Sequence, residues 1–458
     1  MRLWLCLLGL AAVVAASAIA ASPRPGWSRF GYDAARSGDG PATTGINAAN
    51  VRRLVRQQVR LDGTVDSSPI AADGLVVVTT SYGKAIALDP RTGRIRWRFT
   101  PPGYSTWAGT YRITNSSPVS DGRFVWTAAP DGRIYKLALQ TGRQIASGGW
   151  PVAVTRLPER EKLGTALNLD RGHVVVTTGG YIGDAPPYQG HVVVLNAGSG
   201  GILGVFNALC SERADLERPS GCPESGAAIW ARSGAVVDPA TGNLLVATGD
   251  GKWDGRRYWG DSVLMLSPDA RRLRQAWTPK DFAALDSGDV DLGSTAPAIL
   301  PGRLALQSGK DGLMRLLDLR KLNGRGGAGA VTGGEVQTLS TPGGGGLFSA
   351  PAVFGQLVFV AQDGATAGYR LAGRRLRKVW SNGSSGTSPV VAGGLLYVYD
   401  PGGRLNVYVP SSGRRVASLQ AGSGHWSSPI VLDGRVILPE GDANEHATSG
   451  VLNIYRRP

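Results

Sequence analysis

The sequence predicts an all-β fold built from eight similar units, and three observations lead to this prediction. Glycine makes up 66 of the 458 residues, about twice the usual share, and the residues around it are mostly Val, Leu, Ala, Ser and Thr. That mixture is typical of short strands joined by tight turns. Helical periodicity is weak, and the window from Asp269 to Ala276 is the one candidate for it. The third observation is an internal repeat.

The repeated unit consists of a Ser/Thr-rich step ending in proline, an apolar strand, a turn, a second apolar strand and a Thr-Gly or Ser-Gly turn. Six clear copies begin at Ser67-Ser68-Pro69, Ser116-Ser117-Pro118, Ser294 to Pro297, Ser349-Ala350-Pro351, Thr387-Ser388-Pro389 and Ser427-Ser428-Pro429. Their prolines are 49, 179, 54, 38 and 40 residues apart. The interval of 179 residues is too long for one unit.

Two degenerate copies lie inside the long interval. One is near Thr165-Ala166 and continues into His173 to Thr178, and the other is near Trp230 and continues into Ala235 to Thr248. Eight units share the chain at about 55 residues each, which is the size of a four-stranded propeller blade. The sequence therefore predicts an eight-bladed β-propeller, with seven blades as the alternative.

A closed ring needs a partner for the edge of its last blade. We expect one propeller domain over residues 21–458, in which Val51 to Leu61 supplies the outer strand of a last blade whose inner strands run from Ile430 to Tyr455. The Gly-rich segment from Asn323 to Gly346 is interpreted as a flexible loop between strands.

Residues 1–20 have the pattern of a secretory signal peptide. Met1-Arg2 precedes an apolar run from Leu3 to Ala16, and Ala18-Ile19-Ala20 forms an A-x-A cleavage site. Cys6 lies too early in this run for the acylated cysteine of a lipoprotein. No later stretch approaches 18 apolar residues, so no transmembrane segment is predicted. We expect the mature protein to be periplasmic or extracellular.

Export would leave Cys210 and Cys222 as the only cysteines. An even pair in an oxidising compartment predicts one disulfide, which would close a surface loop. Two cysteines are too few for a zinc ribbon, and the absence of a C-x-x-C-H sequence excludes covalently bound c-type haem.

Charge and the remaining motifs exclude several function classes. The formal net charge is +15, but the basic residues are scattered and mark no nucleic-acid motif, so no nucleic-acid partner is expected. No G-x-S-x-G sequence is present, which excludes an α/β-hydrolase. The four histidines lack metal-ligand spacing, and His425, beside Trp426, is interpreted as structural or as lining a central pore.

The segment from Ala87 to Trp97 reads A-x-D-x-x-T-G-x-x-x-W. It resembles the tryptophan-docking motif of the quinoprotein (PQQ) dehydrogenase propellers, and partial copies occur at Asn196 to Gly200 and at Ser267 to Trp277. In such a motif the tryptophan packs flat against the neighbouring blade, and the Asp and Thr-Gly residues set the turn. The motif thus predicts how blades pack and implies no chemistry of its own.

A longer resemblance covers about 90 residues, from Gly226 to Asp318. Four segments follow the order and spacing of PQQ-dependent alcohol dehydrogenases, with the polyvinyl-alcohol dehydrogenase type nearest. They are Ala227 to Trp230, Asp238 to Asp250, Asp289 to Pro297, and Ser308 to Gly312.

The resemblance implies a role for five residues. Trp230 would be the planar floor under PQQ, Lys310 a PQQ contact, Asp250 a Ca²⁺ ligand and Asp289 the general base and a metal ligand, with Asp291 as a further ligand. PQQ is a flat quinone with three carboxylates, so it needs an aromatic plane, cations and a hard metal ion held by oxygen ligands. The alternative is structural: a solvated D-x-D turn, an exposed hairpin lysine and a tryptophan buried between blades.

The sequence departs from the family pattern at three places, which leaves two hypotheses open. It has no adjacent Cys-Cys pair, Asp250 stands where the family usually has Asn, and Gly179 to Asp184 stands where a metal-binding Glu is expected. The first hypothesis is an exported oxidoreductase that uses PQQ and Ca²⁺ to oxidise an alcohol or sugar hydroxyl, in a small molecule or a polymer, with a separate cytochrome as electron acceptor. The second is a non-catalytic propeller that binds a protein partner, as outer-membrane assembly propellers do.

Overall fold

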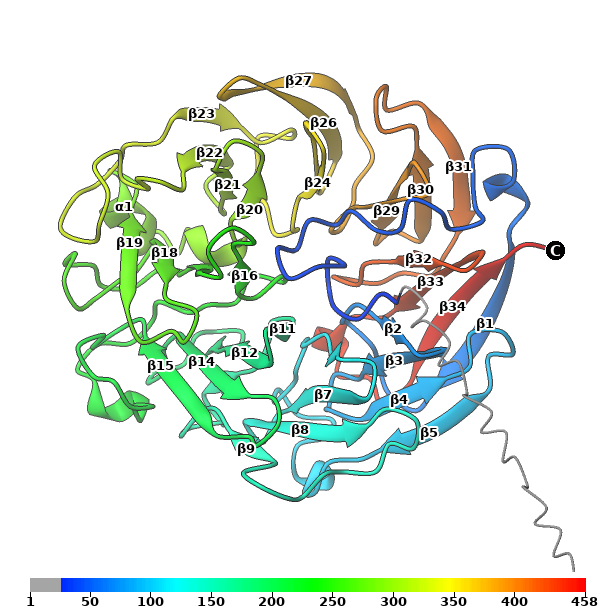
Figure 1. The fold of residues 1–458 in the computed structure, drawn as a ribbon, viewed down its shortest axis with the longest axis horizontal. Helices are drawn as coiled ribbons and strands as arrows, with labels where there is room; N and C mark the ends of the chain where they lie inside the picture. The colour runs from blue at the N-terminus through cyan, green and yellow to red at the C-terminus, as the bar shows by residue number, and fades with distance from the viewer. Residues whose placement is uncertain (1–25) are drawn as a thin grey trace, which may run out of the picture.

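The computed structural model describes residues 26–458 and contains eight four-stranded antiparallel sheets arranged around one axis (Figure 1). The predicted all-β, eight-bladed propeller is therefore confirmed, and the seven-bladed alternative is wrong. No helix within the described residues is long and apolar enough to cross a membrane.

The blades are numbered in chain order, and the strands of each run from the axis outward. Blade 1 consists of β2 (Ile70–Ala72), β3 (Leu75–Thr79), β4 (Ala85–Leu88) and β5 (Ile95–Phe99), and blade 2 of β6 (Val119–Ser120), β7 (Phe124–Ala129), β8 (Arg133–Ala138) and β9 (Val152–Ala153). Blade 3 consists of β11 (Asn168–Asp170), β12 (His173–Thr177), β14 (His191–Asn196) and β15 (Ile202–Asn207), and blade 4 of β16 (Val236–Val237), β17 (Leu244–Ala247), β18 (Val263–Leu266) and β19 (Leu273–Trp277).

Blade 5 consists of β20 (Ala298–Leu300), β21 (Leu304–Ser308), β22 (Leu313–Asp318) and β23 (Gln337–Ser340), and blade 6 of β24 (Ala352–Phe354), β25 (Leu357–Gln362), β26 (Ala365–Ala372) and β27 (Arg375–Asn382). Blade 7 consists of β28 (Val390–Ala392), β29 (Leu395–Asp400), β30 (Arg404–Tyr408) and β31 (Arg415–Gln420), and blade 8 of β32 (Ile430–Leu432), β33 (Arg435–Glu440), β34 (Gly450–Arg456) and β1 (Val55–Leu61). Outside the blades lie β10 (Glu161–Lys162) paired with β13 (Gly179–Gly180), helix α1 (Phe282–Ser287), and the 3-10 turns η1 (Val51–Arg53), η2 (Tyr104–Thr106), η3 (Pro219–Gly221), η4 (Leu292–Ser294) and η5 (Ala443–Glu445).

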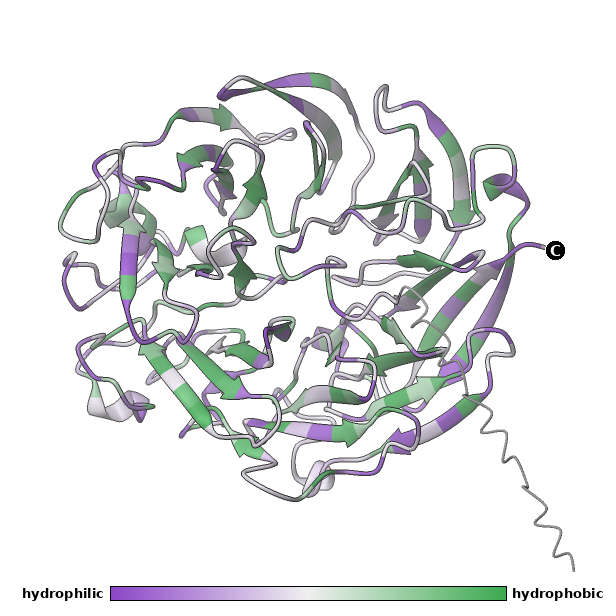
Figure 2. Cartoon of the chain, viewed as in Figure 1, coloured by the Kyte–Doolittle hydropathy of each residue, from purple (hydrophilic) through white to green (hydrophobic). Residues whose placement is uncertain are grey.

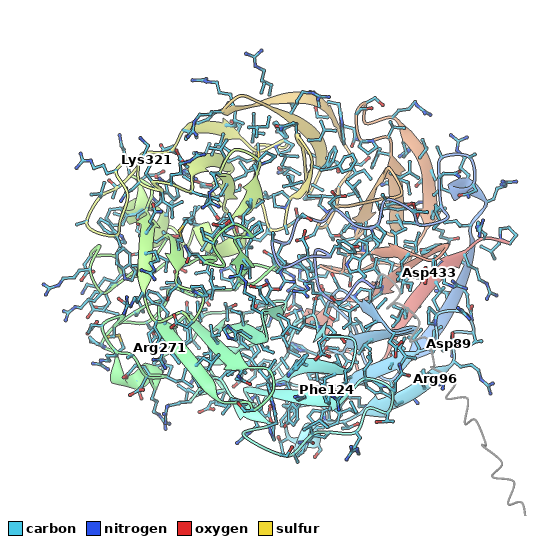
Figure 3. The ribbon with its side chains drawn as sticks, viewed as in Figure 1. Asp89, Arg96, Phe124, Arg271, Lys321 and Asp433 are labelled. Atoms are coloured by element: carbon cyan, nitrogen blue, oxygen red, sulfur yellow. A yellow bond between two sulfur atoms is a disulfide. The ribbon has the colours of Figure 1, made fainter. Side chains whose placement is uncertain are left out.

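Burial changes from the inner to the outer strands of a blade. All five residues of β3 are buried, because the blades pack face to face and cover both sides of the inner strands. In β5 burial alternates, and Arg96 and Arg98 are exposed between apolar residues. Figure 2 shows the same mixture of apolar and polar residues along the outer strands, and Figure 3 places Arg96, Arg271 and Lys321 at the outer edge. The apolar core therefore lies between neighbouring blades.

The docking tryptophans join consecutive blades as the sequence motif predicts. Trp97 on β5 donates a hydrogen bond of 2.7 Å from Nε1 to the Leu139 carbonyl of blade 2. A Cβ on Gly142 would lie 2.5 Å from the Trp97 ring, so the Thr-Gly turn needs a residue without a side chain there. Trp380 repeats this contact between blades 6 and 7, with the Pro410 carbonyl at 2.8 Å.

The repeated Ser/Thr-Pro steps connect the inner strands close to the axis. The amide of Ser68 donates to Ser117 Oγ at 2.9 Å, and the amide of Ser428 donates to Ser68 Oγ at 3.1 Å. Ala350 and Ser388 form the same bond between blades 6 and 7, at 2.9 Å. A hydroxyl at this position therefore satisfies a backbone N–H of an adjacent blade, which explains why Ser recurs there.

The two ends of the described chain meet in blade 8, which is the pairing expected from the sequence. β1 pairs with β34 from Val55 opposite Arg456 to Leu61 opposite Gly450 (Figure 1). The predicted strand begins four residues late because η1 occupies Val51–Arg53. The proposed signal peptide, residues 1–20, lies outside the described residues.

The segment before blade 1 crosses the axis (Figure 1). Its carbonyls accept backbone hydrogen bonds from the inner strands of blades 4 and 6, at Val237 and Val353, and Gly40 donates one to the Val391 carbonyl of blade 7. The buried Arg36 donates to the carbonyls of Phe30, Ala166 and Leu167. This segment therefore covers one mouth of the central axis, the one at which the inner strands terminate. The opposite mouth, at which the inner strands begin, is not covered by this segment.

The structure decides one open case and corrects one expectation. The window from Asp269 to Ala276 contains strand β19 rather than a helix, because its residues pair with β18 at the edge of blade 4. The segment from Asn323 to Gly346 contains strand β23, which completes blade 5 by pairing with β22, and Leu339 packs against the core. The rest of that segment is loop, as expected.

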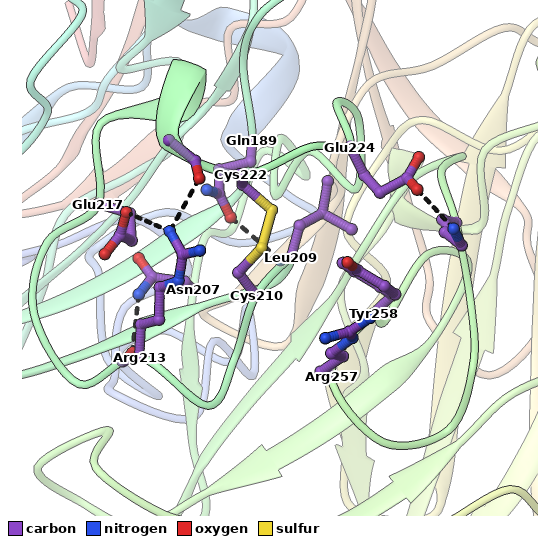
Figure 4. Close-up of a disulfide and its surroundings, with 12 residues drawn as sticks. Gln189, Asn207, Leu209, Cys210, Arg213, Glu217, Cys222, Glu224, Arg257 and Tyr258 are labelled. Carbon is purple, nitrogen blue, oxygen red and sulfur yellow. Dashed lines mark hydrogen bonds and ion pairs between the residues drawn. A yellow bond between two sulfur atoms is a disulfide. The ribbon is translucent and has the colours of Figure 1, made fainter.

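The predicted disulfide between Cys210 and Cys222 is confirmed, with a Cα–Cα distance of 6.1 Å (Figure 4). Both cysteines are buried, and much of the loop between them is exposed. The loop follows β15, and the amide of Leu209 beside it donates a hydrogen bond of 3.0 Å to the side-chain oxygen Oε1 of Gln189 (Figure 4).

Candidate functional site

A cavity of about 350 Å³ lies on the axis, at the end where the inner strands begin. All five residues singled out from the sequence line it, namely Trp230, Asp250, Asp289, Asp291 and Lys310. They come from blades 4 and 5 and from the connection between them.

Three carboxylates converge in this cavity. One oxygen atom from each of Asp250, Asp289 and Asp291 lies within 4.8 Å of the others. Lys310 Nζ is 2.7 Å from Asp289 Oδ1 and 2.5 Å from Asp291 Oδ2, and the amide of Asp250 donates to Asp291 Oδ1 at 2.9 Å. We call Asp250, Asp289 and Asp291 the acidic group.

The local fold explains why these residues meet. Asp250 follows β17 and Lys310 follows β21, which are the second strands of adjacent blades. Asp289 and Asp291 lie between α1 and η4, on the connection that enters blade 5. A Cβ on Gly249 would overlap Asp291 Oδ1, so this carboxylate fits only because position 249 has no side chain.

The acidic group is electrostatically unfavourable by itself. Asp291 is 4% exposed, Asp250 is half-buried, and the side chain of Asp289 is 69% exposed. Burial, followed by the charge of Asp291, raises the pKa of Asp250 to about 8. Burial opposes the charge on Lys310, but its hydrogen bonds to Asp289 and Asp291 raise its pKa above the ordinary value. One ammonium ion therefore faces three carboxyl groups, an arrangement suited to a cation.

A fourth carboxyl group, that of Asp184, lines the same cavity and was not identified from the sequence. Burial, followed by the charge of Asp291, raises the pKa of Asp184. Asp184 ends a turn that begins at Tyr181, just after β13. The sequence contained a signal for it, since the segment from Gly179 to Asp184 stands where the family has its metal-binding Glu.

Cations without carboxylate partners occupy another part of the cavity. Arg232 is 9% exposed and donates to the carbonyls of Gly164 and Asp66, at 3.3 and 2.6 Å. Burial, followed by the charge of Arg232, lowers the pKa of Lys162 to about 8. Within residues 26–458 neither Arg232 nor Lys162 forms an ion pair, so their charges are available to an anion. We call Lys162 and Arg232 the basic group.

Asp66 orients His425 at the edge of the cavity. Its buried carboxylate accepts hydrogen bonds from His425 Nδ1 at 2.8 Å, from Asn115 at 2.7 Å and from the Trp426 amide at 2.8 Å. Burial opposes the charge, but the hydrogen bond from His425 lowers the pKa of Asp66. Both oxygens of Asp66 already accept N–H donors, so this residue positions His425 rather than binding a metal. His425 lines the cavity, in agreement with the pore-lining interpretation.

Trp230 lies between the acidic group and Trp426. Its ring centroid is 5.8 Å from Lys310 Nζ and 6.0 Å from the ring centroid of Trp426, over which the Arg232 guanidinium lies at 4.6 Å. Phe348 completes an aromatic triangle, at 6.1 Å from Trp230 and 5.9 Å from Trp426. The half-buried Trp230 thus contacts aromatic residues at the axis.

Comparison with known proteins identifies relatives of two kinds. A sequence family described as "Outer membrane protein assembly factor BamB" matches residues 34–156. Over 355 residues the chain is 28% identical to quinohemoprotein alcohol dehydrogenase ADH IIB from Pseudomonas putida. This match covers 70% of this chain and 49% of the relative. The chain therefore spans about half the length of the curated relatives it matches.

Solved structures share the fold. Quinohemoprotein alcohol dehydrogenase from Comamonas testosteroni superposes with a TM-score of 0.71 at 18% identity, over 94% of this chain and 80% of that protein. A structure named europium-containing methanol dehydrogenase also has a TM-score of 0.71, at 16% identity, over 94% and 98% of the two chains. The resemblance to the PQQ-repeat propellers of quinoprotein dehydrogenases is confirmed, whereas the nearest type, polyvinyl-alcohol dehydrogenase, stays a prediction.

Proposed function

We propose that this protein is an exported quinoprotein-type oxidoreductase that binds PQQ and Ca²⁺ in the axial cavity and oxidises an alcohol or sugar hydroxyl. The observation that carries the proposal is the meeting of Trp230, the acidic group and Lys310 in one cavity. Sequence relatives named as quinohemoprotein alcohol dehydrogenases support it. We expect a periplasmic or extracellular protein that passes electrons to a separate cytochrome.

The acidic group fits a hard metal ion. Ca²⁺ prefers several oxygen ligands, and three carboxylates are within reach of one ion. The raised pKa of Asp250 reflects burial and like-charge repulsion, and a bound cation would relieve the repulsion. Because one structural neighbour is named for europium, trivalent ions are a second class to test beside Ca²⁺. Asp250, Asp289 and Asp291 would hold the ion, with Asp184 nearby.

The rest of the cavity fits a flat tricarboxylate. Trp230 offers an aromatic plane, and Lys162 and Arg232 offer unpaired positive charges for carboxylates. A volume of about 350 Å³ is in the range of small-molecule sites. The adjacent Cys-Cys pair of the family is absent from the sequence. The exposed Ile182 is among the residues that line the cavity.

In the proposed mechanism, PQQ when bound supplies an electrophilic quinone carbon that accepts a hydride. Asp289 is the exposed member of the acidic group and would take the proton of the substrate hydroxyl. Lys310 donates a hydrogen bond to Asp289 Oδ1 and so fixes the orientation of this carboxylate. The buried Asp291 holds the Lys310 ammonium and the Asp250 amide in place.

Titration of the purified mature protein with PQQ and Ca²⁺ tests the proposal. The quinone absorbance and the melting temperature are followed together, and we expect saturable binding that raises the melting temperature. PQQ at 100 times its Kd would stabilise the folded state by about 2.7 kcal/mol. Absence of binding at high micromolar PQQ, with and without the metal ion, would contradict the proposal.

A non-catalytic role in protein binding is the second candidate. The match of residues 34–156 to the family described as an outer membrane protein assembly factor favours it. Such a protein would bind its protein partner through one face of the propeller, and it would need no cofactor. The same titration separates the two candidates, because a partner-binding propeller is expected to be indifferent to PQQ.

The affinity for PQQ should fall as pH rises through about 8. Burial lowers the pKa of Lys162 from its ordinary value of 10.5 to about 8, so below pH 8 the ammonium attracts a carboxylate and above it the attraction is lost. We expect about a tenfold rise in Kd between pH 7 and pH 9.5 with Ca²⁺ saturating, and Lys162→Gln should reduce this dependence to the part that the ionisation of Asp250 contributes. The exposed Lys280→Gln is the matched control. Equal pH dependence in both variants would exclude Lys162 from the site.

A further inference from the structure

A second cavity, of about 420 Å³, adjoins the first at the axis. The two cavities share Arg232, His425 and Trp426 as a common wall. Phe348, Ala361 and Pro401 contribute apolar surface to the second one, which we call the apolar lobe. A molecule bound near the acidic group could therefore extend past Trp426 into the apolar lobe.

Phe348 is held near the backbone of Lys310 although it is 39% exposed. The Leu347 amide donates to the Gly309 carbonyl at 3.0 Å, and Ser294 Oγ donates to the Leu347 carbonyl at 2.7 Å. A Cβ on Gly346 would lie 3.0 Å from Lys310 Cα and 3.2 Å from the Phe348 ring. The ring thus lies beside the lysine that pairs with Asp289, and its exposed face is free to contact a ligand.

The serine, threonine and glutamine side chains of the apolar lobe already have partners within the protein, and Gln362 bonds to the backbone of Gly343 and Gly345. Ser349 Oγ donates to the Ala361 carbonyl, and Thr387 Oγ1 donates to the Ser427 carbonyl at 2.8 Å. Ser388 Oγ accepts the Ala350 amide at 2.9 Å. Among the side chains that line the lobe, Arg232, His425 and Asp363 could still bond to a sugar, so most of its hydroxyls would lose hydrogen bonds to water without replacing them, at a cost for each unpaired hydroxyl. An aromatic or aliphatic group has no such cost and would gain contact with Phe348 and Trp426.

We infer that the apolar lobe binds the carbon body of the substrate, and that the substrate is an alcohol with an aryl or extended alkyl group rather than a sugar. The oxidation of this substrate rests on the proposed function, whereas its binding in the apolar lobe does not. With PQQ bound, the oxidation would move a hydride, and with it two electrons, from the carbinol carbon to the quinone, while the hydroxyl proton would go to Asp289. The product would be the aldehyde or ketone.

Binding of 2-phenylethanol and of glucose to the cofactor-free protein tests the inference without any turnover. Ligand-observed NMR and intrinsic tryptophan fluorescence are the measurements. We expect saturable binding of 2-phenylethanol and none of glucose at the same concentrations. Phe348→Ala should raise the Kd of 2-phenylethanol at least fivefold, as expected for loss of an aromatic contact.

Phe354→Ala is the matched control, since Phe354 is 37% exposed but lines neither cavity. Phe348→Leu, which retains an apolar side chain, should have an intermediate effect if the Ala variant is poorly folded. Binding of glucose in preference to 2-phenylethanol, or equal effects of the Phe348 and Phe354 variants, would overturn the inference.

The two proposals fail in different ways. Binding of 2-phenylethanol that is lost in Phe348→Ala, together with no binding of PQQ, would support the apolar lobe and overturn the oxidoreductase. Binding of PQQ, with kcat/KM for glucose above that for 2-phenylethanol, would support the oxidoreductase and overturn the substrate class.

Discussion

Asp289→Asn is expected to lower PQQ-dependent dye reduction by a factor of about 10² to 10⁴, the usual contribution of a general base. Asparagine keeps the size of the side chain and an oxygen that can accept the hydrogen bond from Lys310, but it cannot take a proton. The backbone is also suited to the change, because Asp289 has a φ of 52°, in the left-handed region that asparagine tolerates. The substitution therefore removes the chemistry with little change in geometry.

The folded state should be almost unaffected by this substitution. The side chain of Asp289 is 69% exposed, and exposed ion pairs contribute about 0 to 1 kcal/mol. The rate of PQQ-dependent dye reduction checks the loss of turnover, and thermal unfolding of the same preparation checks that the stability is unchanged. Asp286→Asn, at an exposed position of the neighbouring helix α1, is the control. Turnover equal to that of the control would remove Asp289 from the mechanism.

The fold was predictable because its signals are local. A hydroxyl before each inner strand bonds to an adjacent blade, as between Ser68 and Ser117, and a glycine in each docking turn makes room for a tryptophan, as Gly142 does for Trp97. These requirements recur once per blade, so they leave a periodic trace in the sequence. The number of repeats then gave the number of blades.

The site was predictable only where its residues lie close together in the chain. Trp230, Asp250, Asp291 and Lys310 fall within adjacent blades, in an order that resembles a known family. Asp184, Lys162 and Phe348 come from other parts of the ring and meet the first group only because eight blades place their loops around one axis. The basic group and the apolar lobe have no local pattern that a sequence alone would reveal.

Asp291→Asn is expected to have the largest effect on metal binding. Asp291 is 4% exposed and interacts with both Asp250 and Lys310, so its charge acts over short distances in a poorly solvated environment. At an effective dielectric constant of 20, a charge pair separated by about 4 Å is worth up to about 4 kcal/mol. The substitution also removes the repulsion between Asp291 and Asp250 that raises the pKa of Asp250, and this gain offsets part of the lost attraction between Asp291 and the ion. We expect the Kd for Ca²⁺ to rise at least thirtyfold.

The effect should be larger for a trivalent ion than for Ca²⁺, because the lost attraction scales with the charge of the ion. Tb³⁺ luminescence excited through a nearby tryptophan measures binding directly, and Trp230 is well placed as the donor, with its ring centroid 5.8 Å from Lys310 Nζ. Ca²⁺ competition then gives the second affinity. Asp281→Asn, whose side chain is 52% exposed, is the control. Equal affinities in the Asp291 and Asp281 variants would mean that the acidic group does not bind the ion, and the proposed quinoprotein chemistry would lose its metal.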